Sequence, residues 1–128
     1  MRRNERGAAA VEFALVLPLL VLLFAGIAEL GRIYYLQATL SGAAREGVRV
    51  MALQNKSALA VTAVKEAAAP LVLTDAQILV SPITGACTAS STPMTQASVT
   101  ITYTAVLSTT LFLPSVTIRG KGVMQCGG

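Results

Sequence analysis

The hydrophobic pattern begins with a long apolar stretch. Phe13 to Ala28 contains no charged residue, and the small residues Ala8 to Val11 extend this stretch to about 21 residues, interrupted only by Glu12. At about 1.5 Å per residue, a helix of this length spans roughly 30 Å, the thickness of the hydrocarbon core of a bilayer. The pattern therefore predicts a transmembrane helix.

From Glu29 onward the pattern becomes amphipathic. Apolar residues recur at intervals of three and four positions, as in Leu30, Ile33, Tyr34, Leu40, Ala44, Val48 and Met51. Polar residues occupy the positions between them, which is typical of a helix with one buried face. We therefore expect one continuous helix over residues 8–53, with the membrane segment as its first half.

The rest of the chain predicts a small head domain over residues 54–128. A second helix is expected over 58–68, capped by Asn55 or Ser57, with an apolar face formed by Leu59, Val61, Val64 and Ala68. Strands are expected over 76–83, 96–107 and 114–124, where apolar and polar residues alternate in the second of them. The predicted class is α+β, in which an antiparallel sheet of about three strands packs on the short helix and on the outer half of the long helix.

Charge predicts the orientation of the helix. Only 12% of the residues are charged, and Arg2, Arg3 and Arg6 crowd the seven residues before the apolar stretch. Basic flanks stay in the cytoplasm, so we expect residues 1–7 to form a cytoplasmic leader and the head to be exported. The remaining cations form no dense stripe with an aromatic platform, so the net charge of +4 does not indicate a nucleic-acid partner.

The two cysteines, Cys87 and Cys126, both fall in the exported part. In an oxidising compartment two lone cysteines usually form one disulfide, which here closes a loop of about 40 residues. Two unpaired thiols are the alternative.

The residues that carry catalysis are scarce. The chain has no histidine, and the acids beyond the long helix are only Glu66 and Asp75. A Ser-His-Asp triad, a Cys-His dyad and a histidine-containing zinc site are therefore excluded, and no phosphate-binding glycine loop is present. We expect neither an enzyme, nor a metal site, nor a cofactor.

The acid within the apolar stretch needs a physical reason. A carboxylate at the centre of a membrane helix costs roughly 2.5–3.5 kcal/mol. Gly7 offers a protease a backbone without a side chain. A cut after Gly7 makes Ala8 the first residue of the mature chain and Glu12 the fifth. The new ammonium group and the Glu12 carboxylate, in one chain or in adjacent copies, then offset each other's desolvation.

The junction Gly7-x-x-x-x-Glu12-Phe13 resembles the cleavage site of type IV prepilins. More specifically, residues 6–53 resemble the TadE-like family of tight-adherence (Flp) pilus assembly, through Gly7, Val11 to Ala14, Leu17-Pro18, Glu29, Gly31-Arg32 and Ala43 to Arg49. The resemblance implies a minor pseudopilin of the bacterial inner membrane, cut by a prepilin peptidase between Gly7 and Ala8. It also implies pilin or pseudopilin subunits, the assembly machinery and membrane lipid as partners, with Glu12 and Phe13 in subunit pairing.

Arg45, Glu46 and Arg49 lie near the outer end of the long helix. Periodicity alone favours a solvated, internally paired helix face for them. The family resemblance instead implies that Arg45, Glu46, Gly47 and Arg49 contact another helix or a partner subunit.

The sequence also allows two other hypotheses for the processing of the N-terminus. Gly26-Ile27-Ala28 before Glu29 fits the small-x-small pattern of a signal-peptidase site, which would release a secreted domain. An uncleaved anchor would instead hold an envelope binding module whose sheet recognises an external ligand.

Overall fold

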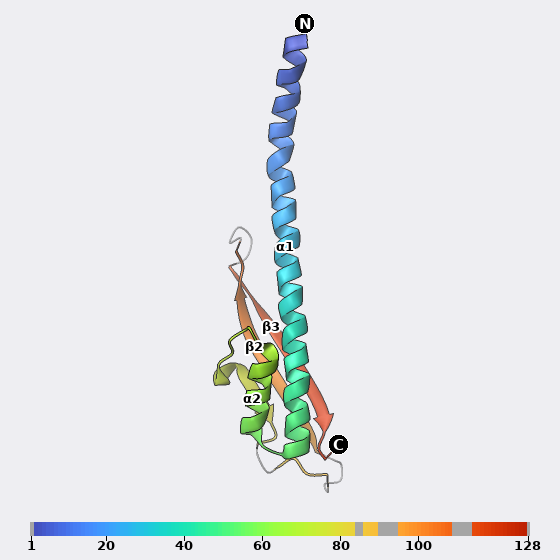
Figure 1. Ribbon diagram of the computed structural model, residues 1–128, viewed down its shortest axis with the longest axis vertical. Coiled ribbons are helices and arrows are strands. Elements are labelled where there is room, and N and C mark those ends of the chain that lie inside the picture. Colours follow the sequence, from blue (N-terminus) through green and yellow to red (C-terminus); the bar gives the residue numbers. More distant parts are fainter. Residues whose placement is uncertain (1, 84–85, 90–94, 109–113, 128) are drawn as a thin grey trace.

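The computed structural model describes residues 2–83, 86–89, 95–108 and 114–127 (Figure 1). In chain order these contain α1 (Arg2–Gln54), α2 (Ser57–Ala68), the short 3₁₀ helix η1 (Asp75–Gln77), β1 (Ile78–Ser81), β2 (Gln96–Val106) and β3 (Ser115–Gln125). The three strands form one antiparallel sheet, so the predicted α+β class is confirmed.

The helix α1 is a single rod that extends far beyond the rest of the molecule (Figure 1). It continues through Pro18 without interruption and begins at Arg2, so the segment expected as a leader is also helical. The head domain gathers around its C-terminal half only. The C-terminal half of α1 is therefore packed against the head, whereas its N-terminal half has no contact with the described residues of the head.

The sheet has β2 in the centre, with β1 and β3 at its edges. Along β2 the buried residues alternate with outward-facing ones, and the buried set is Ala97, Val99, Ile101 and Ala105. Pro82 follows the last residue of β1, an edge strand, where it interrupts no central ladder. The expected alternation therefore fixes which sheet face is buried.

The domain has two layers, helices and sheet. The outer half of α1 packs on β3 and β2, while α2 packs on α1 and contacts β1. Their shared core contains the fully buried side chains of Leu40, Val48, Met51, Val64, Val99 and Ile101. The opposite face of the sheet is largely exposed.

Two glycines in β3 let the strand lie directly on the backbone of α1. A Cβ atom placed on Gly120 would lie 2.5 Å from the carbonyl oxygen of Leu40, and one on Gly122 would lie 2.6 Å from that of Ala44. Because both neighbours are backbone atoms, they cannot yield by a rotamer change. The close contact of helix and sheet therefore depends on the absence of side chains at these two positions.

The second helix differs in detail from its prediction. Its N-cap is Lys56, which makes no side-chain cap hydrogen bond, so the predicted cap at Asn55 or Ser57 is wrong. Its buried residues are Ala60, Val64 and Ala68, while Leu59 remains 42% exposed. Val64 and Ala68 of the predicted face are therefore confirmed, whereas Ala60 is buried in place of Leu59.

Candidate functional site

The N-terminal half of α1 is apolar and uncovered. None of the most hydrophobic window of this helix is buried within the molecule, and bulky side chains such as Phe13, which is 63% exposed, project from it. By length and composition it is the one helix among the described residues that can cross a membrane. An apolar surface of this size on a soluble monomer would be unusual, so α1 is a candidate membrane anchor.

The predicted processing site and the acid within the apolar stretch lie on this uncovered half. Gly7, Ala8 and Glu12 are all exposed, and the space around Gly7 is open. Ala8 and Glu12 are four positions apart on a helix, so they lie on the same face, one turn from each other. Glu12 has no hydrogen bond or ion pair within the described part of the chain, which leaves its carboxylate available for pairing.

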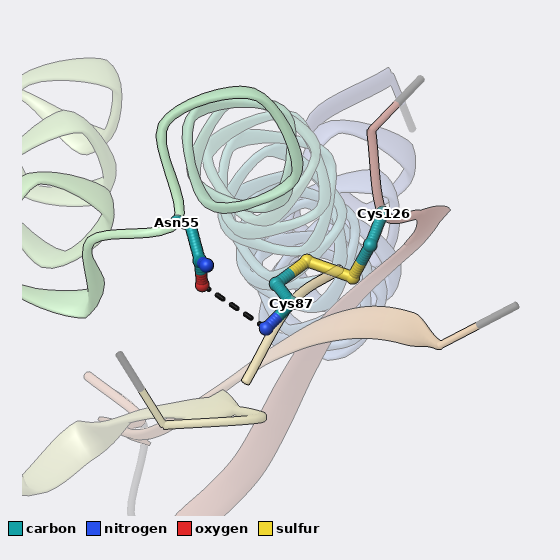
Figure 2. Close-up of a disulfide and its surroundings, with 3 residues drawn as sticks. All are labelled: Asn55, Cys87 and Cys126. Carbon is teal, nitrogen blue, oxygen red and sulfur yellow. Dashed lines mark hydrogen bonds between the residues drawn. A yellow bond between two sulfur atoms is a disulfide. The ribbon is translucent and has the colours of Figure 1, made fainter. Parts of the chain in front are cut away.

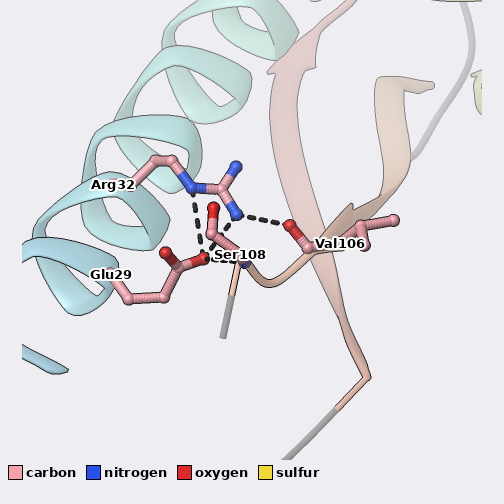
Figure 3. A network of polar contacts seen from close by, with 4 residues as sticks. All are labelled: Glu29, Arg32, Val106 and Ser108. Carbon is pink, nitrogen blue, oxygen red and sulfur yellow. Dashed lines mark hydrogen bonds and ion pairs between the residues drawn. The ribbon is translucent and has the colours of Figure 1, made fainter. Parts of the chain in front are cut away.

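A polar cluster joins α1 to the sheet just beyond the uncharged segment (Figure 3). Arg32 Nη2 lies 2.6 Å from Glu29 Oε1 and also donates to the carbonyl oxygen of Val106 at 2.6 Å. The backbone N–H of Ser108 donates to the same Glu29 oxygen at 3.3 Å. We call these four residues the latch, because they tie α1 to the end of the β2–β3 hairpin.

The latch holds Glu29 ionised. Its side chain is only 11% exposed, whereas that of Arg32 is 40% exposed. The hydrogen bond from Arg32 lowers the pKa of the Glu29 carboxyl, and the Ser108 N–H acts in the same direction. Loss of hydration opposes the shift without reversing it.

Sequence reasoning assigned no role to the latch. Glu29 marks the start of the amphipathic pattern, and Glu29 and Arg32 belong to the motifs of the family resemblance, but neither was expected to contact the sheet. Opposite charges three positions apart, directly after a long uncharged stretch, were the available signal. The partners are backbone groups 74 and 79 residues further along the chain, which no local pattern reveals.

The predicted contact residues near the outer end of α1 separate into two groups. Gly47 is buried and faces α2, where a Cβ atom would meet Val64 and the backbone of Ala60. Arg45, Glu46 and Arg49 are exposed, and none of the ion pairs among the described residues includes them. The contact of Gly47 is therefore explained within the chain, whereas the role of the three charged residues stays a prediction.

The two cysteines form a disulfide at the end of the head farthest from the anchor (Figure 2). Cys87 and Cys126 have Cα atoms 5.2 Å apart and are both buried. The side-chain oxygen of Asn55 accepts a hydrogen bond from the Cys87 N–H at 3.0 Å, and the Gly127 N–H donates to the carbonyl oxygen of Ala52 at 3.0 Å. These bonds hold the Cys87 segment to the turn after α1 and the Cys126 segment to the last turn of α1.

An apolar cavity of about 200 Å³ lies between α1 and the chain that follows α2. Its lining contains no charged side chain and consists of Tyr35, Leu36, Thr39, Ala68, Pro70 and Leu71. The described residues also include no cluster of histidine, cysteine or acidic side chains suited to a metal ion. This cavity therefore offers apolar contact but no acid–base chemistry.

These features combine an uncovered apolar helix with a disulfide-bonded head that packs on the same helix. Residues 7–49 match the family model of TadE-like protein. The resemblance stated from the sequence is thus confirmed over about a third of the chain. No curated protein and no solved structure matches the chain significantly.

The TadE-like match indicates a component associated with the Tad pilus and with its assembly. The family is a structural one rather than a family of enzymes. The matched stretch begins at Gly7 and ends among the exposed charges of Arg45, Glu46 and Arg49. It therefore covers both the uncovered half of α1 and most of the half that packs on the head.

Acidification is expected to open the latch. Because the pKa of Glu29 is lowered in the folded protein, its stabilising effect is complete above the ordinary carboxyl value of 4.5. The effect is lost as the pH falls from that value through the lower folded pKa. The protection factor of the Ser108 amide against hydrogen exchange, which is the intrinsic rate divided by the observed rate, should fall in this window. The Glu29→Gln variant serves as the control, and an equal pH response in that variant would contradict the assignment.

Adding a methyl group at Gly47 is expected to destabilise the head. The new Cβ would press on Val64 and Ala60, and overpacking of this kind costs about 1–3 kcal/mol. Gly42→Ala is the matched control, because Gly42 lies on the same helix in open space, where Ala adds up to about 1 kcal/mol of helix stability. Chemical unfolding of the full-length protein in detergent measures both. Equal free energies of unfolding would show that Gly47 does not contact α2.

Proposed function

We propose that this protein is a pseudopilin-like structural or assembly component of a Tad pilus, anchored in the bacterial inner membrane by α1. The observation that carries the proposal is the continuity of α1. Its apolar half has no cover within the molecule, while its other half is the framework on which the head is built. A protein of this shape presents a hydrophobic helix to lipid or to other helices and keeps its head in water.

The proposed maturation step is a cut between Gly7 and Ala8 by a prepilin peptidase. The open surroundings of Gly7 and the start of the family match at this residue support it. After the cut, the Ala8 ammonium lies one helical turn from Glu12 in the same chain, or beside Glu12 of a neighbouring copy that is slightly staggered. Pairing in either form offsets the cost of a carboxylate in the hydrocarbon core, with Phe13 packing beside it.

The proposed orientation places the leader in the cytoplasm and the head on the periplasmic or extracellular side. The basic residues before Ala8 support it by the positive-inside rule. The disulfide supports it independently, because such bonds persist in oxidising compartments. Both observations support the same side of the membrane for the head.

Arg45, Glu46 and Arg49 are the proposed contact with a partner pilin or pseudopilin. They lie on the outer half of α1 and are exposed, and no described acid or base pairs with them. Arg45 and Arg49 are four positions apart, so they present two guanidinium groups on one helix face. This surface suits a partner that carries carboxylates.

The alternatives differ from this proposal at the N-terminus. A signal-peptidase cut before Glu29 would sever α1 at the point where the latch attaches it to the head. An uncleaved anchor would retain the leader and serve a binding module. The N-terminal residue of the mature protein therefore separates the three functions.

The mature protein is expected to begin at Ala8. Intact-mass measurement of the protein purified from a piliated host should show the loss of residues 1–7. A Gly7→Leu variant should keep the leader, because its side chain obstructs the bond to be cut. A wild-type chain starting at Met1 would support the plain anchor, and one starting at Glu29 would support the secreted domain. Either result would overturn the proposed processing.

Replacing the acid is expected to separate insertion from assembly. Glu12→Leu removes a cost of roughly 2.5–3.5 kcal/mol from membrane insertion, so the variant should fractionate with membranes at least as well as wild type. Piliation, counted by electron microscopy, should fall sharply because the N-terminal ammonium loses its partner. Glu12→Asp keeps a carboxylate and is the control. Normal pili in the Leu variant would rule out the pairing role.

A further inference from the structure

We propose that the hairpin end of the head lies on the bilayer surface and contacts lipid at the boundary of headgroups and acyl chains. We define the hairpin end as residues 104–106 of β2 with residues 107 and 108 after it, together with residue 114 and the first residues, 115–117, of β3. This inference rests on the proposed membrane anchor and adds a second lipid contact to it. The argument uses the height of the latch, the exposed apolar groups at that height and the distribution of charge.

The latch fixes the height of the hairpin end above the hydrocarbon core. The uncharged segment ends at Ala28, so Glu29 and Arg32 lie about 1.5 Å and about 6 Å further along the helix. Ser108 bonds to Glu29 and Val106 bonds to Arg32. The interfacial layer on each side of a bilayer is about 5–7 Å thick, so a span ending at Ala28 puts these two residues inside it. The head has no linker that would lift it into water.

Apolar side chains are exposed at this same height. Val106 is 68% exposed at the end of β2, and Leu30 is 68% exposed on the adjoining turn of α1. Tyr34, which is 77% exposed, follows one turn later, about 9 Å beyond Ala28 and just outside the layer. Aromatic and aliphatic groups at a membrane interface gain contact with acyl chains while polar groups remain wet. By contrast, the cavity beside Tyr35 and Thr39 lies more than about 10 Å beyond Ala28, outside this layer.

The charges of the head avoid the hairpin end. Residues 104–108 and 114–117 include no charged side chain, and the first charge along β3 is Arg119. The charges at the bilayer edge, Glu29 and Arg32, are paired with each other. Pairing lowers the cost of holding both at an interface of reduced polarity. The hairpin end is therefore the part of the head that a lipid surface accepts most readily.

Lipid-dependent fluorescence quenching tests this contact on the full-length protein. Because Cys87 and Cys126 are joined, the variants Val106→Cys and Gln96→Cys each carry one free thiol for an environment-sensitive nitrobenzoxadiazole label. Gln96 is the matched control. It lies on the same strand and the same exposed face as Val106, ten residues and about 33 Å away. The proteins are reconstituted in vesicles of phosphatidylethanolamine and phosphatidylglycerol containing lipids with a nitroxide near the headgroup.

The label at Val106 should be quenched several-fold more strongly than the label at Gln96, with blue-shifted emission. Leu20→Cys reports on the anchor, because residue 20 lies near the middle of the apolar stretch and should respond to a nitroxide deep in the acyl chain. Equal, weak quenching at Val106 and Gln96 with strong quenching at Leu20 would overturn the hairpin contact and leave the anchor intact. Weak quenching at all three positions would overturn both.

Discussion

The contact between the outer half of α1 and the sheet is the interaction on which the rest of this structure depends. It buries Leu40, Val48 and Ile101 in one core and brings β3 against the helix backbone at Gly120 and Gly122. Because backbone atoms are in contact, the strand cannot slide along the helix without a clash. The head is thus built onto the rod rather than tethered to it by a linker, and the position of one fixes the position of the other.

A single helix that passes from lipid to water must satisfy two opposite demands. The first half of α1 has apolar side chains on every face, which suits hydrocarbon, while the second half has one apolar face, which suits a soluble core. The change falls at Glu29 and Arg32, where the first charges after the uncharged segment are paired and bonded to the hairpin. The latch therefore lies at the proposed boundary between the bilayer and water. It holds α1 against the head at the point where contact of the helix with lipid would end.

The sequence predicts those features that burial makes periodic. Spacings of three and four along α1 and the alternation in β2 both reflect one buried face, so the long helix and the sheet follow from them. One position on the face of α2 does not, because Ala60 rather than the larger Leu59 is buried, and the missing side chain at Gly47 lets Val64 and the backbone of Ala60 pack against α1. The role of Asn55 was missed for a related reason. Its side-chain oxygen accepts the Cys87 N–H, a partner that is remote in sequence. The latch depends likewise on backbone groups of the hairpin, which carry no side-chain signature.

The extent of the family match gains meaning from the fold. Residues 7–49 include Gly7 and Glu12 on the uncovered half of α1, and they also include Glu29, Arg32 and Gly47, which contact the head. The matched segment therefore carries more than an anchor, because it also holds groups that attach a head to the rod. The hairpin end and α2 lie outside the match and supply the other side of those contacts. Substitutions within the matched segment can therefore change two properties. One is the surface that α1 presents to lipid or to other helices, and the other is the position of the head on α1. The Glu12 position belongs to the first property and the latch to the second, so the two can be altered separately within one continuous helix.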